Sequence, residues 1–283
     1  MEQCRYATFG AAGVHGMCYV GAVQKYIDAS LFSAWRDNLI GIGGVSSGSI
    51  MALMLSIRMS IEEIKEFLRR FPFTEILLKD MTGSVPSFIR GEGKGFLSGL
   101  SLTFVVRTIL IEKNLDPDLT FKGLCDLGFP ELRVLALDLT HQAPVLFSST
   151  RSPDTPLHVA IRASMSIPFI FHAVKWNKSV LIDGAFVDST GSTLFEDIPE
   201  ANSTTIAFSV CRQRNAEPST RILDVFSEFS RFLLNHRKPS AAFHIEIDPE
   251  GAGPSLNLLQ IDVEHLIEHG SKRSVNRSSK QPE

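Results

Sequence analysis

The spacing of apolar residues along the chain predicts alternating strands and helices. Tyr6–Phe9 is a short β-favouring run, glycines at positions 10, 13 and 16 then mark a tight turn, and Met17–Ala29 has helical spacing. A second unit repeats the design, with a buried strand at Leu39–Ile42, a sharp turn at Gly43–Gly48 and a buried helix at Ser49–Met59. Two such units predict a parallel sheet with helices on both faces, that is, a three-layer α/β/α sandwich.

The remaining periodicities predict further helices and strands. Ser60, followed by Glu62 and Glu63, is typical of an N-cap with an acidic first turn, and an apolar helical face continues to Phe71. Pro72–Gly99 loses this regularity because proline and several glycines interrupt its phenylalanines, so we interpret it as a mobile, partly apolar surface segment. The other expected elements are helices at Leu100–Lys113, Thr120–Leu127, Val159–Ser164 and Ile222–Asn235, and strands at Leu132–Leu139, Val145–Phe147, Val180–Ile182, Ile206–Val210 and Phe243–Ile247.

Length and composition narrow the class of protein. The 283 residues, 44% apolar and 21% charged, suffice for one large α/β domain with a full core. We therefore expect a single domain over residues 1–270 and a disordered polar tail over 271–283. A net charge of -3 gives no basic surface for phosphate groups, which argues against nucleic-acid binding. Nothing in the sequence indicates an oligomeric state.

The cysteines and the apolar runs indicate a compartment. Cys4, Cys18, Cys125 and Cys211 are scattered, without a CxxC pair or metal-ligand spacing, so we expect reduced thiols in a cytoplasmic protein that uses no metal and no cofactor. The glycines after the short charged N-terminus argue against a secretory signal. The longest apolar stretch, Ile50–Ile57, is far short of the roughly 20 residues that span a bilayer. Any membrane contact is therefore expected to be peripheral.

One pentapeptide carries candidate chemistry. The run from Gly44 to Gly48, GVSSG, is the single G-x-S-x-G of the chain and lies between a predicted strand and a predicted helix, where a nucleophile elbow occurs. The small flanking residues allow a turn sharp enough to expose the middle hydroxyl, and the following helix contributes N–H donors. We therefore predict Ser46 as a nucleophile, with Ser47 packed and Ser49 in the first helical turn.

A serine nucleophile needs a base within hydrogen-bond reach, and the sequence offers two kinds. In the chain order of an α/β-hydrolase, the base is a late histidine that an aspartate orients. Alternatively, Asp183 ends a predicted strand directly before Gly184, so its carboxylate projects from the same edge of the sheet as the turn. The candidates for a histidine triad are His236, His244, His265 and His269, with Asp183, Asp224 or Asp262 as the orienting carboxylate.

Four segments together resemble, in order, the four sequence blocks of the patatin-like phospholipases. They are GAAGVHG at residues 10–16, GVSSG at 44–48, ASMSIP at 163–168 and DGA at 183–185, so the resemblance runs from Tyr6 to Asp188. It implies the α/β/α fold and a lipid acyl hydrolase of the phospholipase A, lysophospholipase or acylglycerol esterase type, which works through an acyl-enzyme.

The resemblance also implies a role for each candidate residue. Ser46 attacks the ester, and Asp183 is the sole base, without a histidine. The backbone N–H groups of Ala12 and Gly13 form the oxyanion hole at the N-terminus of the first helix, where developing negative charge is stabilised. The implied partner is a lipid ester, taken from a membrane or lipid-droplet surface.

The first block departs from the family pattern of three adjacent glycines, one further residue and a basic side chain. Ala11 and Ala12 stand at the first two glycine positions and His15 at the basic one. Alanine keeps the N–H donor where φ is negative but is strained where φ is positive. His15 either donates to the oxyanion hole or shields it, and lower or altered activity is expected.

Two other classes of protein remain as alternatives. The departures in the first block leave a non-catalytic lipid-binding or scaffold protein of the same fold, although Ser46 and Asp183 are both present. A dinucleotide-binding protein is disfavoured because the glycine spacing of residues 10–16 is not G-x-G-x-x-G, and glycines follow the second strand where an acid is needed.

The segment Pro72–Leu100 is the candidate for contact with a lipid surface. Its apolar side chains are interspersed with glycines, which suits a lid or an interfacial loop; the alternative is that the same side chains belong to the core. The residues concerned are Phe73, Ile76, Leu77, Phe88 and Phe96.

Overall fold

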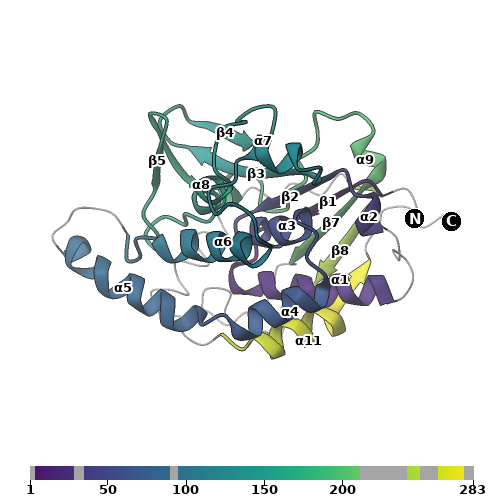
Figure 1. Ribbon diagram of the computed structural model, residues 1–283, viewed down its shortest axis with the longest axis horizontal. Helices are drawn as coiled ribbons and strands as arrows, with labels where there is room; N and C mark the ends of the chain where they lie inside the picture. The colour runs from purple at the N-terminus through teal and green to yellow at the C-terminus, as the bar shows by residue number, and fades with distance from the viewer. Residues whose placement is uncertain (1–3, 29–34, 90–94, 211–240, 249–260, 277–283) are drawn as a thin grey trace.

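The computed structural model describes residues 4–28, 35–89, 95–210, 241–248 and 261–276, and Figure 1 shows their arrangement. The strands of these residues form one nine-stranded sheet. They are β1 Tyr6–Phe9, β2 Gly41–Val45, β3 Glu131–Asp138, β4 Ala143–Phe147, β5 Val174–Trp176, β6 Ser179–Asp183, β7 Thr205–Val210, β8 Phe243–Ile247 and β9 Ser274–Asn276. The predicted helix Ile222–Asn235 lies outside the described residues.

The sheet is parallel at its centre and antiparallel toward its ends. β1 lies between β2 and β7, β2 also pairs with β3, and β7 pairs with β8, all in parallel register. The antiparallel pairs are β3–β4, β3–β6, β5–β6 and β8–β9. Since helices flank this sheet, the predicted α/β/α fold with a mainly parallel sheet is confirmed.

The helices gather mostly around a single large apolar core. In Figure 1, α1, α4 and α11 lie together along one side of the sheet, while α5 extends away from it. Among the described helices, none has the length and apolar character needed to cross a membrane. The helices are η1 Gly13–Met17, α1 Cys18–Asp28, α2 Trp35–Asn38, α3 Gly48–Ser56, α4 Ile61–Arg70, α5 Phe73–Ile89, α6 Leu100–Glu112, α7 Phe121–Asp126, α8 Leu157–Ser164, η2 Gly184–Phe186, α9 Ala201–Thr204 and α11 Val263–Arg273.

Strand β2 runs further than its sequence suggests. The prediction ended the strand at Ile42 and began the turn at Gly43, whereas the strand continues to Val45. Its glycines admit side chains from the opposite layer, because a Cβ at Gly43 would lie 2.8 Å from a methyl group of Leu194. Tertiary packing therefore determines the end of this strand, and the turn begins directly at Ser46.

Two other predictions are corrected. Within Pro72–Gly99, residues Phe73–Ile89 form the helix α5, although a glycine and a proline lie inside it. Residues 271–273 end α11, and Ser274–Asn276 form β9, which pairs with β8, so this part of the expected disordered tail is ordered. Residues 277–283 lie outside the described part of the chain. Local propensity missed both elements because packing against the rest of the fold stabilises them.

Candidate active site

Ser46 occupies the turn between the end of β2 and the start of α3. Its φ is 52°, in the left-handed region that non-glycine residues rarely adopt, and its side chain is buried. The Ser46 carbonyl accepts a hydrogen bond from the Ser49 N–H at 2.9 Å, which closes the first turn of the helix. This strained strand-to-helix turn is the geometry of a nucleophile elbow.

The two glycines of the pentapeptide are required by close backbone approaches. A Cβ at Gly44 would lie 2.5 Å from the Ser49 nitrogen, and one at Gly48 would lie 2.3 Å from the Phe9 carbonyl oxygen. Both distances are shorter than real Cβ contacts, so any side chain would displace the turn. Gly44 and Gly48 therefore allow the close backbone approaches on which the turn depends.

The strand register brings Asp183 to Ser46. β4 pairs with β3 along Val134–Asp138, so β2 and β6 share the other edge of β3 in succession. β2 leaves β3 at Leu135, and β6 ends opposite the next residue, where Asp183 pairs with Ala136. As a result, the Ser46 hydroxyl donates a hydrogen bond to Oδ2 of Asp183 at 2.7 Å.

Burial makes Asp183 an unusual carboxylate. Its side chain is 1% exposed, and desolvation raises its pKa to about 7. The hydrogen bonds from the Ala185 N–H, at 2.8 Å to Oδ1, and from Ser46 favour the charged form and oppose this rise. A carboxylate with a pKa near neutrality is a far better proton acceptor for a hydroxyl than an ordinary aspartate.

The end of α8 and the turn after it hold both residues. The Ser46 N–H donates to Oγ of Ser164 at 2.9 Å, and the Asp183 N–H donates to the Ser166 carbonyl at 3.0 Å. Both serines are fully buried. The ASMSIP segment at residues 163–168 resembles a family block, but the sequence predicts no role for its serines. The signal for such a role was a pair of small hydroxyl residues, Ser164 and Ser166, that lie four and two positions before Pro168.

The glycine loop shows where alanine is tolerated. Ala12 has φ −143°, Ala11 is absent from the residues with positive φ in the described chain, and Gly13 has φ +57°. The retained glycine therefore stands where the left-handed conformation needs it. The Ala12 N–H, an expected oxyanion donor, is bonded to Oγ of Ser47 at 3.2 Å. His15 is buried, 4% exposed, and is absent from the residues that line the pocket beside Ser46.

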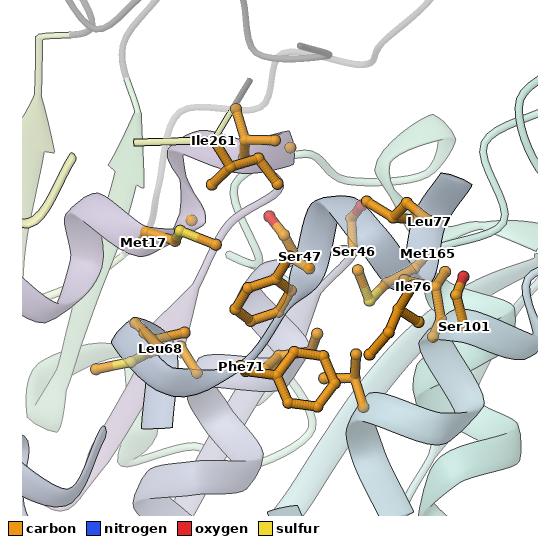
Figure 2. Close-up of a pocket in the computed structure, with 18 of the residues that line it drawn as sticks. Met17, Ser46, Ser47, Leu68, Phe71, Ile76, Leu77, Ser101, Met165 and Ile261 are labelled. Carbon is orange, nitrogen blue, oxygen red and sulfur yellow. The ribbon is translucent and has the colours of Figure 1, made fainter. Parts of the chain in front are cut away.

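Ser46 lies in the wall of a large apolar pocket. The pocket has about 1000 Å³ of space, its open mouth included, and aliphatic, aromatic and methionine side chains dominate its surface (Figure 2). α5 contributes Phe73, Ile76 and Leu77, so these three residues of the predicted lipid-contact segment line the pocket. Other lining residues are Met17, Ile50, Met51, Met54, Leu68, Phe71, Leu102, Met165, Ile170 and Ile261.

The late histidines lie elsewhere. His244 bonds to Ser209 at 2.7 Å, His269 bonds to the Asp248 carbonyl at 2.6 Å, and neither is a hydrogen-bond partner of Ser46. Asp262 caps α11 by accepting the N–H of His265 at 3.0 Å. The candidates His236 and Asp224 lie outside the described residues. In the described part of the chain, Asp183 is thus the titratable group bonded to the Ser46 hydroxyl.

The described residues contain neither a disulfide nor a cluster of metal-ligand side chains. The three cysteines of the described chain, Cys4, Cys18 and Cys125, are unpaired. Within the same residues, no three His, Cys, Asp or Glu side chains are grouped so that they could hold a metal ion.

The geometry defines a class: an α/β protein with a nucleophile elbow at the carboxyl end of a parallel sheet, beside a buried carboxylate and an apolar pocket. The chain belongs to the patatin-like phospholipase family, since the family model described as Patatin-like phospholipase matches residues 8–194. That range contains all four sequence blocks, and the predicted family resemblance is confirmed.

Viral and bacterial proteins are similar to this chain. Uncharacterized protein R571 of Acanthamoeba polyphaga mimivirus is 28% identical over 69% of this chain, which spans 63% of that protein. Probable lipid hydrolase 463L of Invertebrate iridescent virus 6 is 26% identical over 79% of this chain and 72% of its own length. The crystal structure of VipD from Legionella pneumophila has the same fold, with a TM-score of 0.59 at 12% identity, over 96% of this chain and 66% of VipD.

Proposed function

We propose that this protein is a lipid acyl hydrolase in which Ser46 and Asp183 form a catalytic dyad. The 2.7 Å hydrogen bond between their side chains carries the proposal. Ser46 Oγ attacks the ester carbonyl carbon while its proton passes to Asp183, which then gives that proton to the departing alcohol, and an acyl-enzyme remains. Asp183 then activates the water that releases the fatty acid.

The pocket supports a lipid as the substrate. A pocket that is lined mainly by apolar side chains and opens beside Ser46 suits a fatty acyl chain, whose transfer from water is favourable along its whole length. The viral relative named as a probable lipid hydrolase is consistent with this assignment. Phospholipids, lysophospholipids and acylglycerols share the acyl ester that the site would cleave.

The dyad is tested by substitution of its two members. Ser46→Ala and Asp183→Asn are each expected to lower kcat by roughly 10⁴-fold or more, because the two residues act as one unit. Release of fatty acid from a mixed lipid extract, followed by mass spectrometry, gives the rate. Ser203→Ala and Asp126→Asn alter exposed side chains of other elements and serve as matched controls.

A fluorophosphonate probe with peptide mapping identifies the nucleophile independently. The adduct is expected on Ser46. An adduct on another residue, or full activity of Asp183→Asn beside an inactive variant of a late histidine, would replace the dyad with a histidine triad. Lipid binding without turnover in the wild-type protein would support the non-catalytic alternative.

We also propose that the substrate is taken from a lipid surface at the mouth of this pocket. Leu100, at the start of α6, is 72% exposed and Phe169 is 63% exposed. The Phe96 N–H donates to the Phe169 carbonyl at 3.0 Å, so the segments that carry Phe96 and Phe169 are adjacent. Ile170, the neighbour of Phe169, lines the pocket. Large apolar side chains next to an apolar pocket favour a peripheral lipid contact.

Vesicle binding tests this contact. A Phe96→Ser, Phe169→Ser double variant is expected to bind phosphatidylcholine vesicles at least tenfold more weakly while it hydrolyses a soluble short-chain ester at the wild-type rate. Leu127→Ser, which alters another exposed apolar residue, at the end of α7, is the control. If vesicle binding and ester hydrolysis fall together and Tm is lower, the two phenylalanines belong to core packing instead.

A further inference from the structure

The hydroxyl of Ser47 has one hydrogen bond in the described structure, and it accepts that bond. The donor is the Ala12 N–H, at 3.2 Å. The sequence predicts only that Ser47 packs, and the family resemblance implies that the Ala12 N–H serves the oxyanion directly. Since an N–H group donates one strong hydrogen bond, the Ala12 donor is committed to Ser47 and cannot fully serve a second acceptor.

The neighbouring residues and its own backbone fix the position of the Ser47 hydroxyl. Gly16 faces it, and a Cβ at that position would lie 2.9 Å from Ser47 Oγ. Ser47 itself has φ −57° and ψ −26°, an ordinary helical conformation at the start of α3, so its side chain lies there without backbone strain. The glycine of the loop and the serine of the elbow are therefore complementary in shape.

The Ser47 hydroxyl also has an O–H donor that faces the apolar pocket without an acceptor among the described residues. A serine hydroxyl can donate one hydrogen bond and accept two. Among the described residues, none accepts from Ser47, although its side chain lines the same pocket as Ser46 (Figure 2). A donor that faces an apolar pocket gains most from an acceptor that the substrate brings.

We propose that the Ser47 hydroxyl is a donor of the oxyanion hole and relays the Ala12 N–H to the reacting carbonyl oxygen. This inference rests on the proposed hydrolase function. As Ser46 Oγ bonds to the carbonyl carbon, the π pair moves onto the carbonyl oxygen and the Ser46 proton moves to Asp183. Ser47 keeps its proton and donates a hydrogen bond to the new oxyanion. The bond from Ala12 polarises this O–H and strengthens its donation.

The relay changes which groups donate hydrogen bonds in the oxyanion hole. The Ala12 N–H acts through the Ser47 hydroxyl, whereas in a hole built of N–H groups alone it would bond to the substrate directly. Gly13 remains as a second donor in the loop. The Gly13 N–H has no hydrogen-bond partner within the described residues. Two donors of different kinds, one hydroxyl and one amide, would then stabilise the oxyanion.

Ser47→Ala tests the relay. A kcat lowered by about 10- to 100-fold with KM unchanged is expected, because the lost bond forms only in the transition state. Ser203→Ala, a serine-to-alanine change at an exposed position of α9, is the matched control. A kcat that equals or exceeds that of the wild type would overturn the relay, since it would show that the Ala12 N–H serves the oxyanion better once Ser47 is removed.

A sulfur substrate separates this role from a structural one. A thionoester places sulfur, a weak hydrogen-bond acceptor, where the oxyanion forms, so an intact hole favours the oxygen ester. The ratio of oxygen-ester to thionoester kcat/KM is expected to fall at least fivefold in Ser47→Ala. An unchanged ratio beside a lower Tm would assign Ser47 to folding. If Ser46→Ala leaves wild-type turnover intact, the proposed function fails instead, whatever Ser47 does.

Discussion

At the scale of the residue, the environment of Asp183 determines its chemistry. Two effects oppose each other: burial raises the pKa of the carboxyl, and the hydrogen bonds from Ala185 and Ser46 lower it. Burial is the larger effect, and the pKa lies at about 7. The sequence identified Asp183 through the DGA block, but its burial could not be predicted, because it depends on how β6 joins β3 beyond the end of β2.

This pKa predicts the pH dependence of hydrolysis. The base must be deprotonated, so activity is present above the raised pKa and is lost as the pH falls through it. For an uncharged short-chain ester, kcat/KM is expected to fall about tenfold per pH unit below about pH 7. A pH–rate profile from pH 4 to 9 gives the midpoint. A midpoint near 4, the ordinary range of aspartate, would contradict a desolvated base.

At the scale of the element, the sequence predicts best where local chemistry determines the structure. Ser60 and Glu63 form a reciprocal capping box, with hydrogen bonds of 3.1 and 2.6 Å, and α4 begins directly after Ser60 as expected. The first parallel unit was also predictable, because β1 and the α1 helix follow simple periodicity. Each of these signals lies within a few residues of the element that it determines.

Elements that depend on distant contacts were missed. Asp80 of α5 accepts hydrogen bonds from the N–H groups of Ser98 and Gly99, both at 2.9 Å, and so ties α5 to the start of α6. That tie, together with the apolar pocket, stabilises a helix that its proline and glycine argue against. The hydrogen bond from Ser46 to Ser164 likewise joins residues 118 positions apart, which no local pattern reveals.

At the scale of the whole molecule, the two ends of the described chain are joined by close helix packing. A Cβ at Gly21 of α1 would lie 1.9 Å from the Ile267 carbonyl oxygen, and one at Gly270 of α11 would lie 1.9 Å from the Cys18 carbonyl oxygen. The glycines therefore let the two backbones touch. Because α1 follows the loop that carries Gly13, this packing also supports the candidate site.

Gly21→Ala is expected to destabilise the protein by about 1–3 kcal/mol, since the added methyl group has no space and the backbones must separate. Thermal unfolding gives the change as a lower Tm. Gly123→Ala in α7 is the control, because its Cβ would meet side-chain atoms rather than backbone, namely a methyl group of Leu119 at 3.0 Å and the Thr120 hydroxyl at 3.3 Å. Equal Tm values for the two variants would show that α1 and α11 do not require this contact.

The left-handed backbone of Ser46 implies that a serine at this position lowers the stability of the fold. A non-glycine residue there costs on the order of 1–3 kcal/mol, and glycine adopts the same φ of 52° with little strain. Ser46→Gly should therefore melt at a higher temperature than Ser46→Ala, although both lack the hydroxyl. A Tm of Ser46→Gly at or below that of Ser46→Ala would refute this trade-off. If it holds, the glycine variant is a robust inactive form in which an uncleaved lipid can be trapped for crystallography.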